Sequence, residues 1–204
     1  MMTSDWQAYT PATELAEAVR SRRLSPVEIT EAALRRIDDS QPVLNAFITV
    51  AHDEAMRQAY EAEKAITRGD ELGPLHGVPF SVKDLVNTRG VRTTMGSLIF
   101  ENNVPENDAV PVARLRAAGG IMVGKTTTPE FGHKPFTRAP LFGDTPNAWD
   151  QDRIAGGSSG GAAVAAAAGL APLNVGTDGG GSIRIPAAAN GIVGMKATLG
   201  TIPH

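Results

Sequence analysis

Side chains able to cleave an amide bond occur at three places in this sequence. Lys83 follows a short apolar run, Ser158 and Ser159 form a pair between glycines, and Ser182 follows three consecutive glycines. A serine hydroxyl attacks a carbonyl effectively only when a base takes its proton. A lysine can be that base when burial lowers its pKa from the ordinary value of about 10.4. These residues predict acyl transfer by a serine that a lysine activates.

The glycine run before Ser182 suits a second need of this chemistry, the stabilisation of a developing negative charge. Gly179, Gly180 and Gly181 let the backbone approach a ligand closely, because they carry no Cβ. At the start of a helix the N–H groups of such a run converge on an anion. Ser182 could attack a carbonyl there while the neighbouring N–H groups hold the resulting oxyanion. The glycine run therefore makes Ser182 a candidate nucleophile.

Residues 119–126 match the letters of a phosphate-binding P-loop, but their chemistry argues against one. The middle of a P-loop is an exposed turn whose N–H groups face phosphate. Here that position holds Ile121, Met122 and Val123, which are typical of a buried strand. We therefore predict a strand at residues 121–123 and no nucleotide site.

Residues 156–160 match the nucleophile elbow of α/β-hydrolases, a motif that needs an apolar strand before it and a histidine after it. The preceding residues 150–153 are polar, and the only histidine downstream is His204, the last residue. A Ser–His–Asp triad is therefore not predicted. The other histidines lie too far apart in sequence to suggest a metal site, at His52, His76 and His133.

The composition excludes several other classes of site. The chain has 204 residues and no cysteine, which rules out disulfides, thiolate metal ligands and a cysteine nucleophile. A net charge of -3 gives no electrostatic reason for binding nucleic acid or an anionic membrane. The N-terminal residues lack the apolar run of a signal peptide, and the run at 162–168 is too short to span a bilayer. We expect a soluble, cytoplasmic protein.

Strands and helices alternate along the chain, which predicts an α/β fold that must bring these side chains together. We expect Ser25, Pro26 and Glu28 to form a capping box, and Asp108 to cap a later helix. Helices are predicted at 13–22, 26–37, 52–67, 109–118, 160–169 and 183–190, strands at 46–50, 80–82, 121–123 and 173–175, and loops at 73–79 and 126–156.

Three segments of the sequence resemble the amidase signature family. Residues 154–200 resemble its long signature block, residues 76–97 its lysine-bearing segment, and residues 123–132 the stretch that follows. The resemblance runs from about residue 10 to residue 204. It implies a mixed β-sheet flanked by helices in one domain over 1–204, with a helical region at 1–70 and part of a catalytic core at 71–204. Because members of the family are much longer, it also implies that the fold is incomplete in this chain.

The resemblance assigns a role to each candidate residue. It implies a Ser–cis-Ser–Lys triad, in which Ser182 is the acyl nucleophile, Ser158 relays protons and Lys83 is the base. It also implies a cis peptide bond before Ser158. The remaining positions are oxyanion-hole N–H groups from Gly179, Gly180 and Gly181, and supporting side chains at Ser159, Asp178 and Arg184.

The activity implied by this resemblance is hydrolysis of a small-molecule amide to an acid and ammonia or an amine, through an acyl-enzyme. The reaction requires no metal or organic cofactor. A homodimer or a further C-terminal segment is expected to complete the substrate pocket. Two alternatives remain open. The chain is a non-catalytic fragment of such an amidase, or it is the glutaminase component of a tRNA-dependent amidotransferase.

Overall fold

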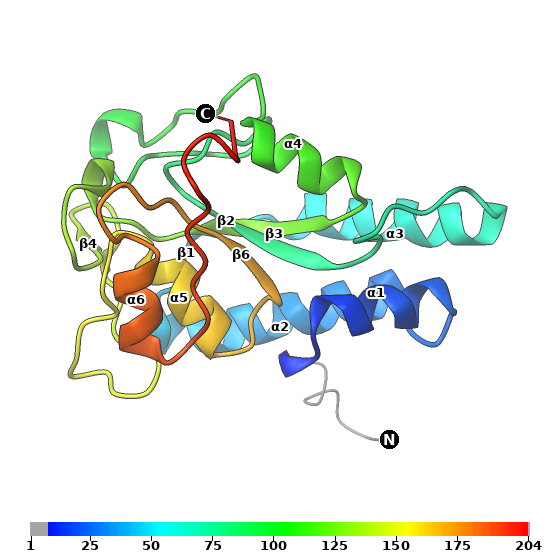
Figure 1. Ribbon diagram of the computed structural model, residues 1–204, viewed down its shortest axis with the longest axis horizontal. Coiled ribbons are helices and arrows are strands. Elements are labelled where there is room, and N and C mark those ends of the chain that lie inside the picture. Colours follow the sequence, from blue (N-terminus) through cyan, green and yellow to red (C-terminus); the bar gives the residue numbers. More distant parts are fainter. Residues whose placement is uncertain (1–7, 204) are drawn as a thin grey trace.

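A computed structural model describes residues 8–203, so residues 1–7 of the N-terminal segment and His204 lie outside the described part. Helices and strands alternate through most of it (Figure 1). The helices are α1 (Ala12–Arg20), α2 (Pro26–Leu44), α3 (His52–Arg68), α4 (Val110–Ala117), α5 (Gly160–Ala167) and α6 (Arg184–Asn190). The strands are β1 (Phe47–Val50), β2 (Pro79–Lys83), β3 (Ile121–Thr126), β4 (Arg138–Ala139), β5 (Gly143–Asp144) and β6 (Leu173–Val175).

Local sequence signals define the ends of the long helices α2 and α3. The Ser25 side chain accepts a hydrogen bond from the N–H of Val27, and Glu28 accepts one from the N–H of Ser25, which confirms the predicted capping box. Helix α2 continues to Leu44, beyond the predicted end at residue 37. Helix α3 ends at Gly69, whose φ of 77° is a left-handed conformation that glycine adopts without steric cost.

The predicted cap at Asp108 is wrong. Helix α4 begins at Val110, its N-cap residue is Ala109, and no side chain caps it. The Asp108 carboxylate instead accepts a hydrogen bond of 2.7 Å from the N–H of Arg89 and pairs with Arg116 at 3.0 Å. The Arg89 N–H from a distant loop and the Arg116 guanidinium on α4 both bind this carboxylate. It is therefore not available to cap the N-terminus of α4.

Four strands form one mixed sheet in the order β1-β3-β2-β6. Strand β1 is antiparallel to β3, whereas β2 is parallel to both β3 and β6. The register pairs Val82 with Lys125 on one side and with Val175 on the other. The carboxyl ends of β2, β3 and β6 therefore lie at the same edge of the sheet. Strands β4 and β5 form a separate hairpin within the predicted loop at 126–156.

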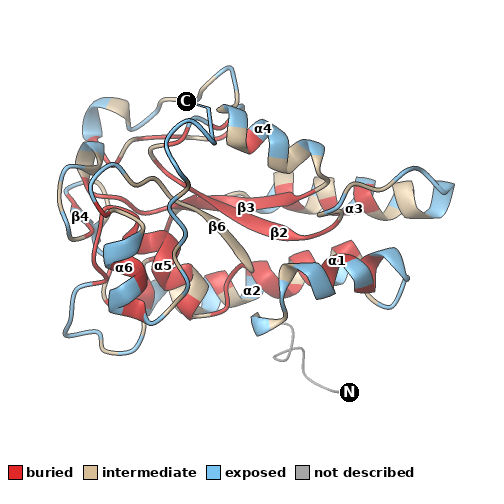
Figure 2. Ribbon diagram, in the orientation of Figure 1, coloured by how far each residue is buried: buried red, intermediate tan, exposed pale blue. Residues whose placement is uncertain are grey.

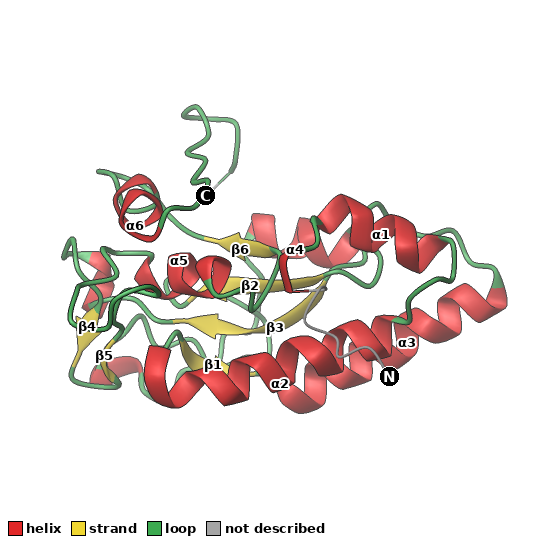
Figure 3. Cartoon of the chain, turned by 90° about the horizontal axis from the view of Figure 1, so that it is seen from below, coloured by secondary structure: helices red, strands yellow, loops and turns green. Residues whose placement is uncertain are grey.

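The sheet lies between layers of helices, and its two central strands are buried along their length (Figures 1 and 2). Phe80 and Val82 of β2 pack with Val112 of α4 on one face. Val123 of β3 packs with α2, α3 and α5 on the other, and α3 runs beside α2 (Figure 3). This arrangement confirms the predicted α/β class. Because side chains alternate along a strand, Lys83 points away from the Val82 face.

The predicted strand within the P-loop-like segment is confirmed and is longer than expected. Residues 121–126 form β3, and every one of them is buried. Lys125, which would contact phosphate in a P-loop, is wholly enclosed. The polar segment before Ser158 is a loop with one isolated bridge between Pro146 and Ile154, so the strand of a nucleophile elbow is absent there.

Thr30 on α2 provides a test of the core packing. Its side chain is fully buried, and its hydroxyl has no hydrogen-bond partner among the described residues. Thr30→Val removes an unsatisfied hydroxyl and keeps the shape, so the free energy of unfolding should rise by about 1 kcal/mol. Urea denaturation measures this change. Thr127→Val is the matched control, because the Thr127 hydroxyl is 2.7 Å from that of Thr145 and its loss should be destabilising. A drop in stability for Thr30→Val would contradict the packing.

Candidate active site

Lys83 is the last residue of β2, and its side chain is fully buried. The ammonium nitrogen Nζ lies 2.6 Å from the Ser158 hydroxyl oxygen and 2.8 Å from the Thr177 hydroxyl oxygen. Ser158 comes from the segment before α5, and Thr177 follows β6. The parallel pairing of β2 with β6 brings Thr177 to Lys83. Ser158 reaches them because α5, which it precedes, packs against both strands.

Burial changes the acid–base properties of Lys83. Removal from water disfavours the charged amine and lowers the pKa of Lys83 to about 7. The negative charge of Asp178 opposes this effect, since it favours the ammonium form. A substantial fraction of Lys83 is therefore neutral near pH 7 and carries a free lone pair.

The segment from Gly157 to Ser159 turns sharply into α5. The Gly157–Ser158 peptide bond is cis, which confirms the geometry that the resemblance implied. Ser158 and Ser159 are both almost fully buried. The Ser159 N–H donates a 3.1 Å hydrogen bond to the Ser182 carbonyl oxygen, and the Ser159 hydroxyl donates a 3.2 Å hydrogen bond to the Thr177 carbonyl oxygen. Ser159 therefore ties the serine pair to the glycine-rich loop through the main chain.

Asp178 organises that loop. Its carboxylate accepts hydrogen bonds from the N–H groups of Gly181, Ile183 and Arg184, and it also pairs with the Arg184 guanidinium at 2.9 Å. The Asp178 side chain is only 1% exposed, whereas that of Arg184 is 55% exposed. The guanidinium, followed by the backbone donors, holds the pKa of Asp178 well below its usual range. Asp178 is therefore an anion at neutral pH.

The three glycines of the loop do not share one environment. The Gly181 N–H is engaged by Asp178 at 2.7 Å, and this residue has a φ of 114° that favours glycine. Gly179 and Gly180 are exposed, and no hydrogen bond occupies their N–H groups within residues 8–203. The loop thus presents two unoccupied backbone donors next to Ser182, rather than the three predicted from the glycine run.

Ser182 itself is half-buried at the end of this loop, just before α6. Its carbonyl oxygen is fixed by the Ser159 N–H, whereas no hydrogen bond joins its hydroxyl to Ser158 or Lys83 in the described part of the chain. The structure thus brings all three predicted residues to one edge of the sheet. Only the Lys83–Ser158 half of the relay is in hydrogen-bond contact.

A turn at residues 130–132 forms a wall beside Ser158. A Cβ atom on Gly132 would lie 3.2 Å from the Ser158 hydroxyl oxygen and 2.5 Å from Cδ1 of Leu85. Gly132 also has a φ of 68°, so a larger residue is excluded there on two grounds. Phe131 in the same turn packs edge-on against Phe100. The segment 123–132, which resembles a stretch of the amidase signature family, therefore places its backbone at Gly132 close to the Ser158 hydroxyl.

Sequence reasoning missed a buried ion pair next to Lys83. Asp84 and Lys125 are both fully buried, and Lys125 Nζ lies 3.8 Å from Oδ1 of Asp84. Burial raises the pKa of Asp84 and lowers that of Lys125 to about 8. Lys125 also donates hydrogen bonds to the Val86 carbonyl and the Thr93 hydroxyl, while Asp84 accepts two from Thr94. The pair anchors the loop after β2. Its one sequence signal is that Asp84 and Lys125 each stand two residues beyond the end of a predicted strand.

Thr177 was also missed, although its hydroxyl touches Nζ of Lys83. A single threonine before an aspartate and a glycine run carries no chemical signal of its own. Thr177 lies close to Lys83 only because β6 pairs with β2 in this register.

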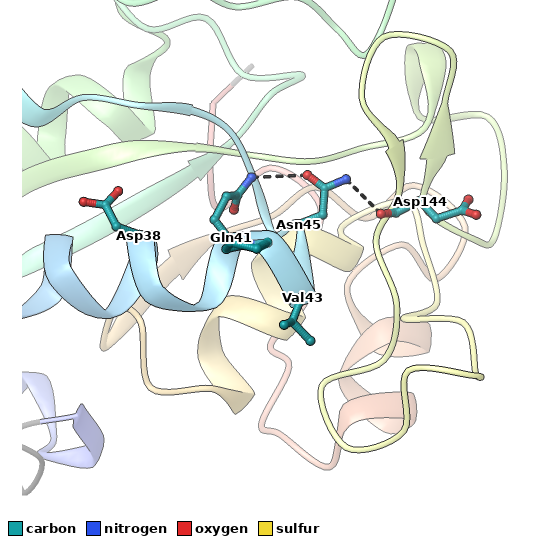
Figure 4. Close-up of a pocket in the computed structure, with 6 residues that line it drawn as sticks. Asp38, Gln41, Val43, Asn45 and Asp144 are labelled. Atoms are coloured by element: carbon teal, nitrogen blue, oxygen red, sulfur yellow. Dashed lines mark hydrogen bonds between the residues drawn. The ribbon is translucent and has the colours of Figure 1, made fainter.

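A separate hollow of the surface lies away from these residues. A cavity of about 600 Å³ lies between the end of α2 and β5, and its lining includes Asp38, Asn45 and Asp144 (Figure 4). Its carboxylates already have partners, because Asp38 contacts His52 and Asp144 pairs with Arg138. No group of three or more potential metal ligands was found among residues 8–203, and none of the helices there is long and apolar enough to cross a membrane.

Comparison with known proteins places the chain in a family. The family model described as Amidase matches residues 28–204. The chain belongs to the amidase signature family. An acylamidase of Rhodococcus erythropolis is 47% identical to this chain over 203 residues, which are 100% of the chain and 43% of the relative. A component of the glutamyl-tRNA(Gln) amidotransferase of Carboxydothermus hydrogenoformans is 43% identical over 194 residues, 95% of the chain and 40% of the relative.

Solved structures show the same relationship. A bacterial aryl acylamidase of the amidase signature family superposes with a TM-score of 0.85 at 36% identity, over 88% of this chain and 38% of that protein. A fatty acid amide hydrolase superposes with a TM-score of 0.89 at 29% identity, over 93% of the chain and 34% of that protein. The fold is therefore the amidase-signature fold, and the chain spans about two fifths of the length of the relatives it matches.

Proposed function

We propose that this chain carries the acyl-transfer centre of an amidohydrolase that cleaves carboxylic amides through a serine acyl-enzyme. The observation that carries the proposal is the 2.6 Å contact between the buried Nζ of Lys83 and the Ser158 hydroxyl. A buried lysine with a pKa near 7 that touches a serine has the properties of a general base. The kinship with an acylamidase and an aryl acylamidase supports the same chemistry.

In the proposed acylation step, neutral Lys83 accepts the proton of Ser158, and Ser158 accepts the proton of Ser182. The Ser182 oxygen forms a bond to the amide carbonyl carbon, and the carbonyl electron pair moves to oxygen. The N–H groups of Gly179 and Gly180 stabilise this oxyanion, because they are backbone donors with no internal partner among residues 8–203. The proton then returns through Ser158 to the amide nitrogen, and the C–N bond breaks.

Deacylation reverses the proton path with water as the nucleophile. Lys83 and Ser158 take a proton from water, which attacks the acyl carbon, and the proton passes to the departing Ser182 oxygen. Asp178 supports both steps by holding the glycine-rich loop in place through the N–H of Gly181. Ser159 supports them through its hydrogen bond to the Ser182 carbonyl.

A second candidate is the glutaminase role in a tRNA-dependent amidotransferase. Several relatives 43–50% identical to the chain are components of glutamyl-tRNA(Gln) amidotransferases. In that case the amide is the side chain of glutamine, and the released ammonia passes to a partner protein. Ammonia release from glutamine but not from simple acyl amides would favour this candidate.

We also propose that further polypeptide completes the substrate pocket. Val193, Met195 and Leu199 are 97%, 81% and 90% exposed in the stretch after α6, and β6 is an edge strand. Large apolar side chains exposed in one segment mark a surface that another element covers. The relatives that this chain matches contain more than half of their length outside the matched region, which supports the same conclusion.

Active-site labelling tests the proposed function. The purified chain should form a covalent adduct with a fluorophosphonate, and peptide mapping by mass spectrometry should place that adduct on Ser182. The same preparation should release ammonia or amine from an acyl amide. A chain that unfolds cooperatively but neither reacts with the probe nor turns over an amide or ester would support the non-catalytic fragment.

A further inference from the structure

Lys83 has a second hydrogen-bond partner that the relay described above does not use. The Thr177 hydroxyl oxygen lies 2.8 Å from Nζ of Lys83, whose side chain is fully buried. We propose that Thr177 is a positioning residue, whose hydroxyl oxygen accepts one N–H of Lys83 and thereby directs the amine lone pair at Ser158. This inference rests on the proposed function, because it concerns the base of that reaction.

The argument begins with the geometry of a neutral amine. A neutral lysine has two N–H donors and one lone pair, and rotation about its terminal C–N bond exchanges their directions. Nζ of Lys83 has two oxygen neighbours, at Ser158 and Thr177. When Thr177 takes an N–H, the lone pair is left for the Ser158 proton. Without that acceptor, orientations with an N–H toward Ser158 compete, and these cannot accept a proton.

Thr177 is itself held firmly. Its carbonyl accepts a hydrogen bond from the Ser159 hydroxyl, and its N–H lies 3.3 Å from the same oxygen. A threonine side chain is branched at Cβ, so few rotamers are open to it. Both contacts to Ser159 are made by the main chain of Thr177. Thr177→Val therefore removes the hydroxyl and keeps the shape and the contacts that hold the loop.

The charged groups around Lys83 are few, which makes the effect of one hydroxyl measurable. Asp178 faces Lys83 from the loop after β6, and its charge is balanced by Arg184. Asp84 directly follows Lys83, Lys125 lies on the neighbouring strand β3, and the two pair with each other. A hydroxyl oxygen binds an ammonium more strongly than a neutral amine. Loss of the Thr177 hydroxyl should therefore lower the pKa of Lys83. It should also leave the Lys83 amine free to rotate, so that its lone pair no longer points at Ser158 in every molecule.

Labelling by a fluorophosphonate as a function of pH provides the test. In Thr177→Val the rate at the high-pH plateau should fall by roughly tenfold or more, and the rising limb should move to lower pH. Thr177→Ser keeps the hydroxyl and should remain within about threefold of the wild type in both respects, on the scale of a weakly perturbed contact. Thr30→Val, which removes an unpartnered hydroxyl near the start of α2, should leave both unchanged.

A direct titration of Lys83 makes the inference independent of turnover. The carbon-13 signal of the Lys83 Cε reports its protonation in any folded sample, whether or not the chain reacts with the probe. A lower midpoint in Thr177→Val than in the wild type, restored in Thr177→Ser, supports the inference. Equal midpoints, or a plateau rate unchanged by Thr177→Val, overturn it. Absence of labelling in the wild type would instead overturn the proposed function, so the two failures are distinguishable.

Discussion

Ser182→Ala should abolish acylation of the chain by a fluorophosphonate and its release of ammonia or amine from amides. Removing a nucleophile that acts as one unit with its base costs on the order of 10⁴–10⁶ in rate. Alanine at this position leaves the backbone contacts intact, since the Ser182 carbonyl and not its hydroxyl binds the Ser159 N–H. Time courses of labelling, read by intact-protein mass spectrometry, measure the loss.

Ser40→Ala is a suitable control for that experiment. Ser40 lies on α2, and its hydroxyl bonds only locally, to the Ile37 carbonyl. This variant should be labelled at the wild-type rate. Ser182→Ala should also keep the wild-type unfolding midpoint, because its side chain makes no hydrogen bond in residues 8–203 that the fold would lose. Labelling of Ser182→Ala at the wild-type rate would show that another residue is the nucleophile.

Lys83→Met should reduce acylation by about 10³–10⁴, the range at the upper end of general base catalysis. The charged form of Lys83 cannot accept a proton, and burial sets the pKa of this group to about 7. The wild-type rate should therefore be low well below pH 7 and rise as the pH increases through 7. Lys83→Met should lose this limb as well as the rate, which a series of labelling rates at different pH values detects.

The pH dependence of the free energy of unfolding checks the folded state of Lys83→Met. The pKa of Lys83 is lower in the folded chain than in the unfolded chain, so the unfolded chain binds the proton more tightly. Stability from this group is therefore smallest below pH 7 and increases as the pH rises toward the unfolded value. Methionine does not titrate, so this rise of stability with pH above 7 should be absent from the variant. Acylation of a folded Lys83→Met with an unchanged pH profile would show that Lys83 is not the base.

Local signals in the sequence predicted the six α-helices of residues 8–203 and most of their ends, but not the end of α2 at Leu44. The capping box at Ser25 and Glu28 and the left-handed Gly69 involve residues within one turn of each other, so neighbouring side chains decide them. The same logic gave the wrong cap at Asp108. There the carboxylate binds the Arg89 N–H and the Arg116 guanidinium instead. Only the fold brings Arg89 close to Asp108.

The sequence by itself pointed to the proposed class of chemistry, because three features can be recognised without coordinates: a lysine after an apolar strand, a serine pair between glycines, and a serine behind a glycine run. It also determined the family, which the matched residues 28–204 bear out. Only the tertiary structure decided which atoms meet. Lys83 and Ser158 are 75 residues apart, and Lys83 and Thr177 are 94 apart. Thr177 meets Lys83 because β2 and β6 are parallel neighbours, and Ser158 meets it because α5, which it precedes, packs against both strands. The burial that lowers the pKa of Lys83 has the same origin, since distant elements must close around a side chain before it leaves water.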